Sequence, residues 1–68
     1  MAQFRQFFLI QSKRDGSFLR EDLTFTHLAV RAGRIYDAHE AVDTAINVLD
    51  DDYSIFQSYE ILDDVSIH

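Results

Sequence analysis

The segment from Asp37 to Leu49 constrains the fold more than any other part of the sequence. Asp37 and Glu40 stand three residues apart, which is the spacing of a capping box at the start of a helix. Apolar side chains then recur at helical spacing and form one stripe, which consists of Ala38, Ala41, Val42, Ala45, Ile46 and Leu49. Because half of this stripe is alanine, the sequence predicts one main helix that packs closely against a sheet.

Two segments with alternating side chains predict the main strands of that sheet. The first, Phe4 to Gln11, carries aromatic and large aliphatic residues on both of its faces, so we expect it in the centre of the sheet. The second, Tyr53 to Leu62, directs Tyr53, Ile55, Tyr59 and Ile61 to one side. A helix between two strands that can pair predicts a sheet with the helix on one face.

The residues between the first strand and the main helix predict short elements. Asp15-Gly16 is a strong hairpin signal and favours a type I′ turn, followed by a short returning strand over 17–20. Residues 21–26 are expected to form a loop or a brief third strand. Thr26 is a candidate N-cap for a short helix over 27–32, and Gly33 is expected to end that helix in the left-handed conformation.

The predicted fold is therefore α+β, with the order β-β-(short α)-α-β. We expect a small antiparallel sheet of three to four strands with the main helix packed on one face, in a single domain that covers residues 1–68. The chain has 68 residues and no cysteine, so neither a disulfide nor a cysteine zinc site can stabilise it. A domain of this size is marginally stable, and its core must come from packing alone or from packing with self-association.

Charge is distributed unevenly along the chain. The net charge is −6, all six Lys and Arg residues lie in residues 1–34, and residues 35–68 contain nine acids. Such asymmetry indicates either an internal charge complement or a surface for a partner of opposite sign. The acidic half is not expected to bind nucleic acid directly, because phosphate repels it.

A pattern that spans most of the chain resembles small phage and prophage proteins. In that pattern a DG hairpin, an aromatic-Leu pair, a segment that ends in Ala, an aromatic residue with a polar cap and a helix that opens with Glu-Ala precede a last strand. The matching positions are Asp15-Gly16, Phe18-Leu19, Ala32, Tyr36, Asp37 and Glu40-Ala41. The resemblance implies an α+β fold and a phage or prophage origin, and proteins of this kind include anti-CRISPR proteins and other inhibitors of host machinery. It carries over no catalytic residue.

The main helix and its surroundings predict an acidic surface that binds a partner. Glu40, Asp43, Asn47 and Asp50 recur three or four residues apart, opposite the apolar stripe. The predicted surface consists of Asp37, Glu40, Asp43, Asp50, Asp51, Asp52, Asp63 and Asp64. Such a surface can dock on a basic groove that ordinarily holds nucleic acid, as inhibitors that imitate DNA do. An acidic surface kept for solubility is the alternative.

Sites for chemistry are weaker candidates. His39 with Asp43 has a spacing that suits a metal ligand pair or a general base, and Asp50 to Asp52 could bind calcium. The calcium loop lacks its central glycine, no phosphate-binding glycine loop occurs, and no Gly-x-Ser-x-Gly motif surrounds a serine. We therefore expect no enzyme activity, no cofactor and no metal.

The basic half offers two further alternatives. Arg5, Lys13, Arg14 and Arg20 are interleaved with Phe4, Phe7 and Phe18, a mixture that can bind single strands by stacking. The same half could instead pair with the acidic half of a second copy in a head-to-tail or two-fold dimer. A dimer is also favoured by the large apolar side chains, which are more than one thin sandwich covers.

Together these features predict a non-enzymatic inhibitor of phage or mobile-element origin in the host cytoplasm. Its expected partner is a host protein with a basic surface. No membrane partner is expected, because the apolar run FFLI near the start is too short for a signal peptide or a span. The alternative is a small structural or assembly protein that works as a homodimer through an exposed sheet surface.

Overall fold

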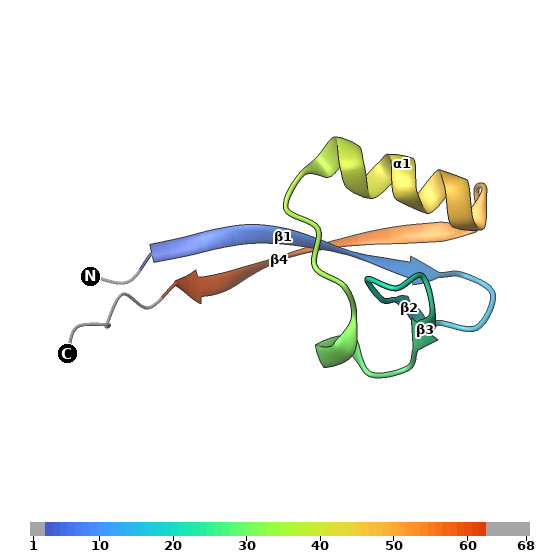
Figure 1. Cartoon of the computed structure of the whole chain (residues 1–68), viewed down its shortest axis with the longest axis horizontal. Helices are drawn as coiled ribbons and strands as arrows, with labels where there is room; N and C mark the ends of the chain where they lie inside the picture. The colour runs from blue at the N-terminus through green and yellow to red at the C-terminus, as the bar shows by residue number, and fades with distance from the viewer. Residues whose placement is uncertain (1–2, 63–68) are drawn as a thin grey trace.

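The structure, a computed structural model, describes residues 3–62 and forms one sheet with one helix beside it (Figure 1). The elements are β1 (Gln3–Ser12), β2 (Phe18–Leu19), β3 (Phe25–Thr26), the 3-10 helix η1 (Ala29–Arg31), α1 (Ala38–Leu49) and β4 (Tyr53–Leu62). The four strands are antiparallel to their neighbours and lie in the order β3-β2-β1-β4. The predicted α+β class, helix position and element order are confirmed.

A long ribbon of β1 and β4 dominates the sheet. The two strands pair along their whole length, from Gln3 opposite Leu62 to Ser12 opposite Tyr53. Helix α1 lies along only one end of this ribbon, and the other end extends beyond it (Figure 1). We call residues 8–12 with 53–57 the inner half and residues 3–7 with 58–62 the outer half. The central position predicted for the first strand is confirmed, because β2 occupies its second edge.

Helix α1 begins as its sequence predicts. The Asp37 carboxylate accepts a hydrogen bond of 3.1 Å from the backbone N–H of Glu40, which satisfies one of the free donors of the first turn. Ala41, Ala45 and Leu49 are buried against the sheet, where Ile10 and Leu19 complete the core. The side of the sheet that α1 covers is called the helix side below, and the opposite side the open side.

One part of the predicted apolar stripe is not buried. Val42 and Ile46 are exposed, although both belong to the stripe. A two-stranded ribbon is narrow, so it covers only the alanine-rich centre of the stripe and leaves this flank of the helix free. The prediction that the whole stripe packs on the sheet is wrong for these two residues and for Ala38, which is exposed in the first turn of the helix.

The loop after β1 differs from the predicted type I′ turn. Such a turn needs positive φ at two successive residues, whereas only Gly16 has one, at 76°. Residues 13–16 form a longer loop that is closed by the bonds from Ser12 N to Ser17 O, 2.8 Å, and from Gly16 N to Ser12 O, 3.0 Å. The Asp15 carboxylate accepts from both the backbone N–H and the hydroxyl of Ser17, which favours this wider turn.

The predicted short helix is reduced to the 3-10 turn η1. Thr26 Oγ1 accepts a bond of 3.1 Å from the N–H of Leu28, but the N-cap of η1 is Leu28 itself, so the prediction that Thr26 is the N-cap is wrong, and helical geometry ends before Ala32. Gly33 is not left-handed, and that prediction is wrong. A side chain there would place Cβ 2.8 Å from the backbone nitrogen of Glu21, so glycine is needed for the close approach of two backbone segments.

Candidate functional site

The solvent side of α1 carries the acidic residues that helical spacing predicts there. Asp43 and Asp50 are exposed and lie on the side of the helix away from the buried Ala41 and Ala45. Asp51 follows directly and is also exposed. Within residues 3–62, none of these three acids forms a salt bridge. We call Asp43, Asp50 and Asp51 the acidic face.

The helix end that carries Asp50 and Asp51 has an unfavourable backbone conformation and an unfavourable charge. Asp50 has φ 58° and ψ −113°, a region that glycine occupies far more readily than a residue with a side chain. Its N–H donates to Ile46 O at 3.0 Å, and the N–H of Asp52 donates to Leu49 O at 2.9 Å, which fixes this turn. Carboxylates here also face the negative end of the helix dipole, with no basic residue in the last turn.

The other members of the predicted acidic surface cap the helix, border a pocket, pair with an arginine or lie outside the described residues. Asp37 caps α1, and Glu40 lines a pocket between α1 and β2 together with Arg20 and Arg34. Asp52 accepts a bond of 2.9 Å from Arg14 Nε. Asp63 and Asp64 fall outside residues 3–62.

The field of the acidic face reaches a neighbouring arginine. The pKa of Arg14 is raised above its usual value, mainly by its hydrogen bond to Asp52 and further by the charges of Asp52, Asp50 and Asp51. Arg14 neutralises one side of the Asp50–Asp52 turn and remains exposed itself. The acidic face thus has one basic residue at its border and none on the helix.

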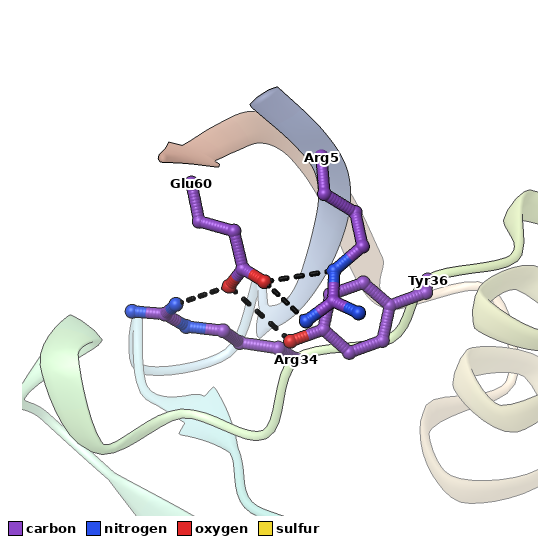
Figure 2. Close-up of polar contacts among 4 residues, drawn as sticks. All are labelled: Arg5, Arg34, Tyr36 and Glu60. Carbon is purple, nitrogen blue, oxygen red and sulfur yellow. Dashed lines mark hydrogen bonds and ion pairs between the residues drawn. The ribbon is translucent and has the colours of Figure 1, made fainter. Parts of the chain in front are cut away.

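A second polar cluster lies on the open side of the outer half (Figure 2). Glu60 accepts hydrogen bonds from Arg5 Nε at 2.9 Å and Nη2 at 2.5 Å, from Arg34 Nη1 at 2.5 Å and from the Tyr36 hydroxyl at 3.2 Å. The guanidinium of Arg5 stacks over the Tyr36 ring at 4.1 Å, and that of Arg34 stacks over Phe7 at 4.6 Å. We call Arg5, Arg34, Tyr36 and Glu60 the Glu60 cluster.

The Glu60 cluster ties the segment before α1 to the ribbon. The hydrogen bond from Arg5 to Glu60 holds the pKa of Glu60 below its usual value, and the hydrogen bonds from Arg34 and Tyr36 lower it further. Both carboxylate oxygens of Glu60 accept hydrogen bonds from this chain. The cluster therefore stabilises the outer half and leaves few free hydrogen-bonding positions for a ligand. It also gives the internal charge complement that the uneven sequence charge allowed, because its acid comes from residues 35–68 and its arginines from residues 1–34.

Sequence reasoning missed this cluster, although one signal was present. Antiparallel pairing of the two predicted strands brings Arg5 directly opposite Glu60 once the register is set. Arg34 and Tyr36 gave no such signal, because they arrive through a single β-bridge between Ile35 and Phe8. The bridge places the two neighbours of Ile35 on the open side, where Glu60 lies.

The structure also places the histidines and the basic residues that the sequence offered as candidates. His39 and His27 are exposed. Among residues 3–62, no three His, Asp or Glu side chains come close enough together to hold a metal ion. The proposed basic-aromatic cluster is also dispersed, because Arg5 and Arg14 are both engaged in ion pairs at opposite ends of β1 and Phe7 is buried.

Comparison with known proteins adds no relative to this picture. No family model, no curated protein and no solved structure matches the chain. The resemblance to phage and prophage proteins therefore stays a prediction. In the part of the chain that the structure describes, α1 and η1 both lack the length and apolar character needed to cross a bilayer.

Proposed function

We propose that the protein acts by binding another protein through the acidic face of α1, without catalysis. The partner is a protein with a basic surface that ordinarily holds nucleic acid, and the effect of binding is inhibition of that partner. The observation that carries the proposal is that no acid of the acidic face forms a salt bridge within residues 3–62, although the backbone disfavours Asp50 and the helix dipole disfavours both Asp50 and Asp51. An origin in a phage or mobile element and action in the host cytoplasm belong to the same proposal, on the strength of the sequence resemblance.

The distribution of charge in three dimensions supports the acidic face over the rest of the surface. The three salt bridges among residues 3–62 use Glu60 and Asp52 as their acids and leave the helix acids free. Long-range attraction to a basic partner depends on such unneutralised charge and raises the association rate. Asp43 is held on the helix itself, and the turn that carries Asp50 and Asp51 is fixed by backbone bonds from Asp50 N to Ile46 O and from Asp52 N to Leu49 O.

The local cost at Asp50 supports a functional rather than a merely solubilising role. Solubility requires acids anywhere on the surface, and the chain has many exposed positions that carry no strain. A residue with a side chain at φ 58° costs about 1 kcal/mol or more compared with glycine. Positions where a sequence departs from its local preference are frequently functional.

The experiment compares charge removal on the acidic face with equal charge removal elsewhere. D43N/D51N removes two acids from the acidic face, and E21Q/D22N removes two from the exposed loop before β3. Each tagged variant is used to capture proteins from a nuclease-treated bacterial lysate at low and at high salt. We expect the wild type and E21Q/D22N to retain nucleic-acid-binding proteins at low salt and to release them at high salt. D43N/D51N should retain them at least tenfold less.

Asp50 allows a sharper test that separates stability from binding. D50G is expected to raise the free energy of unfolding by about 1 kcal/mol, because glycine relieves the backbone, and yet to weaken capture. L23G is the matched control, since Leu23 also has positive φ, 68°, and carries no charge. It should gain stability without losing capture. Equal capture by the wild type, D43N/D51N and D50G would refute the proposed function.

A further inference from the structure

The outer edge of β4 is the longest unpaired strand edge in the described part of the chain. β4 has ten residues and lies at the end of the sheet, where β1 is its only neighbour among residues 3–62. Such an edge pairs readily with another strand unless charge, proline or a bulge protects it. β4 contains no proline, and its single charged residue, Glu60, is held by Arg5 and Arg34 of the same chain. The edge is therefore open to strand addition.

The hydrogen-bond pattern of β1 identifies which groups of β4 are free. The backbone N–H and C=O of Phe8 both bond to Ile35, at 2.7 Å and 3.0 Å. The backbone N–H and C=O groups of even-numbered β1 residues therefore point away from β4. The N–H of Lys13, directly after β1, donates to Asp52 O at 2.9 Å. The backbone N–H and C=O groups of odd-numbered residues therefore point toward β4. Because antiparallel pairs alternate, the backbone groups of β4 that point outward belong to Tyr53, Ile55, Gln57, Tyr59 and Ile61.

The outward-pointing residues of β4 share the helix side of the sheet. Ile55 packs against the core under α1, and side chains two residues apart lie on the same side of a strand. A second β4 that pairs antiparallel with this edge must match outward groups with outward groups. It therefore matches odd-numbered residues with odd-numbered residues, and the helices of the two copies lie on the same side of one continuous sheet.

The apolar surfaces on the helix side are complementary between two such copies. In the outer half, Tyr59 is 61% exposed and Ile61 is 65% exposed, because α1 covers only the inner half. On α1, Val42 is 38% exposed and Ile46 is 46% exposed. These two lie on the flank opposite Thr44, which faces the pocket beside β2, so they border the β4 edge. One surface is a strand without a helix above it, and the other is a helix flank that overhangs an unpaired edge.

We infer that the protein forms a two-fold dimer in which the β4 strands of two copies pair antiparallel about Gln57. Gln57 is the middle of the outward-pointing residues, so this register uses all of their backbone groups. It places Ile55 opposite Tyr59 of the second copy and Tyr53 opposite Ile61. The inner half of each copy then lies beside the outer half of the other, and the Val42–Ile46 flank of each helix covers the bare apolar residues of its partner.

Charge permits this arrangement. In the same register Glu60 lies opposite Ser54 of the second copy, so no like charges meet across the new strand pair. The acidic face points away from the sheet and remains available on both copies. The dimer is thus independent of the proposed function: loss of pairing and loss of partner capture are separate outcomes.

The first test is the oligomeric state of the wild type. Sedimentation velocity over a series from low micromolar to near-millimolar concentration should show a reversible change from monomer to dimer. A molecule that remains a monomer throughout would overturn the inference, and the free edge would then be a site for a strand of another protein. Growth beyond the dimer would also overturn it, because a closed two-fold interface uses up the β4 edge.

The second test uses the position of Gln57, which lies opposite Gln57 of the second copy on the two-fold axis. Q57K and Q57E each place two like charges face to face on the two-fold axis, and each should weaken the dimer about tenfold or more. An equimolar mixture should recover dimers that contain one copy of each. N47K is the matched control, because it adds the same charge on the exposed side of α1 and should dimerise as the wild type does. Dimers of Q57K as stable as those of N47K, or a mixture without recovery, would contradict the register.

Discussion

The inner and outer halves of the β1–β4 ribbon have the same strand pairing and opposite environments. On the helix side of the inner half, Ile10 is 1% exposed. On the same side of the outer half, Phe4 is 66% exposed. Both residues alternate correctly along one strand, and only the layer above them differs. Alternation in a sequence thus defines the two sides of a strand, whereas burial depends on what the rest of the chain can place over each side.

The two halves are also stabilised by different forces. The inner half buries aliphatic side chains under the alanine residues of α1, which is a contribution of removed apolar area. The outer half is held from the open side by the Glu60 cluster, which is a contribution of charge-assisted hydrogen bonds and of arginine stacking on Tyr36 and Phe7. An isolated two-stranded ribbon is marginal in water, so the outer half depends on this polar support.

The largest expected difference between the halves comes from removing one isoleucine from each. Ile10→Ala should lower the free energy of unfolding by about 2–5 kcal/mol, because it leaves a cavity under α1. Ile61→Ala should cost about 0.5 kcal/mol or less, since its side chain is exposed. Urea unfolding followed by circular dichroism in dilute solution measures both without a contribution from the dimer. Equal losses would show that the outer half is as tightly packed as the inner half.

A smaller effect is expected from the N-cap of the helix that covers the inner half. Asp37→Ala removes the acceptor for the Glu40 N–H and should cost about 1 kcal/mol. Asp43→Ala is the matched control on the same helix, because it removes an exposed acid that caps nothing and should change stability by about 0.5 kcal/mol or less. Thermal unfolding monitored at a helix wavelength compares the two. If both variants unfold at the same temperature, the Asp37 cap does not stabilise α1, the helix that packs over the inner half.

Local signals made the inner half predictable from the sequence. The cap at Asp37, the helical spacing up to Leu49 and the alternation from Tyr53 are contained within short segments, and the bounds of α1 and β4 follow from them. The outward direction of Asp43 and Asp50 follows from the same helical geometry. These features depend on neighbours in the chain and not on the final arrangement of the sheet.

The features that the sequence did not reveal all depend on distant segments. The exposure of Val42 and Ile46 follows from the width of the sheet, and the need for Gly33 follows from the approach of Glu21. The positive φ of Asp50 follows from the sharp turn that leads α1 directly into β4. Arg34 reaches Glu60 only through the β-bridge of Ile35. In each case a contact between segments decides a property that periodicity leaves open.

The smallest and most local effect is expected at Glu60, and it tests the polar support of the outer half alone. Glu60→Gln keeps the size of the side chain and removes its charge, so the bonds from Arg5 and Arg34 lose their charge-assisted strength. Hydrogen exchange of the Ser58 and Phe7 amides should accelerate, while that of the Leu9 and Phe56 amides, which pair between β1 and β4 in the inner half, should not. Glu21→Gln, which removes an exposed acid outside the cluster, should leave all four unchanged.

The pH dependence of this difference has a defined sign. The pKa of Glu60 in the folded protein lies below its ordinary value of 4.5, so its charge stabilises the outer half above that value and the stabilisation is lost as pH falls through the lowered pKa. The wild type should therefore exchange more slowly than Glu60→Gln at neutral pH, and the two should converge in acid, where both side chains are uncharged. The pKa values of Asp15 and Asp22 are also lowered, by their bonds from Ser17 and Thr24, but both variants share these groups and they cancel in the comparison. A difference that persists unchanged in acid would mean that Glu60 supports the outer half by its shape and not by its charge.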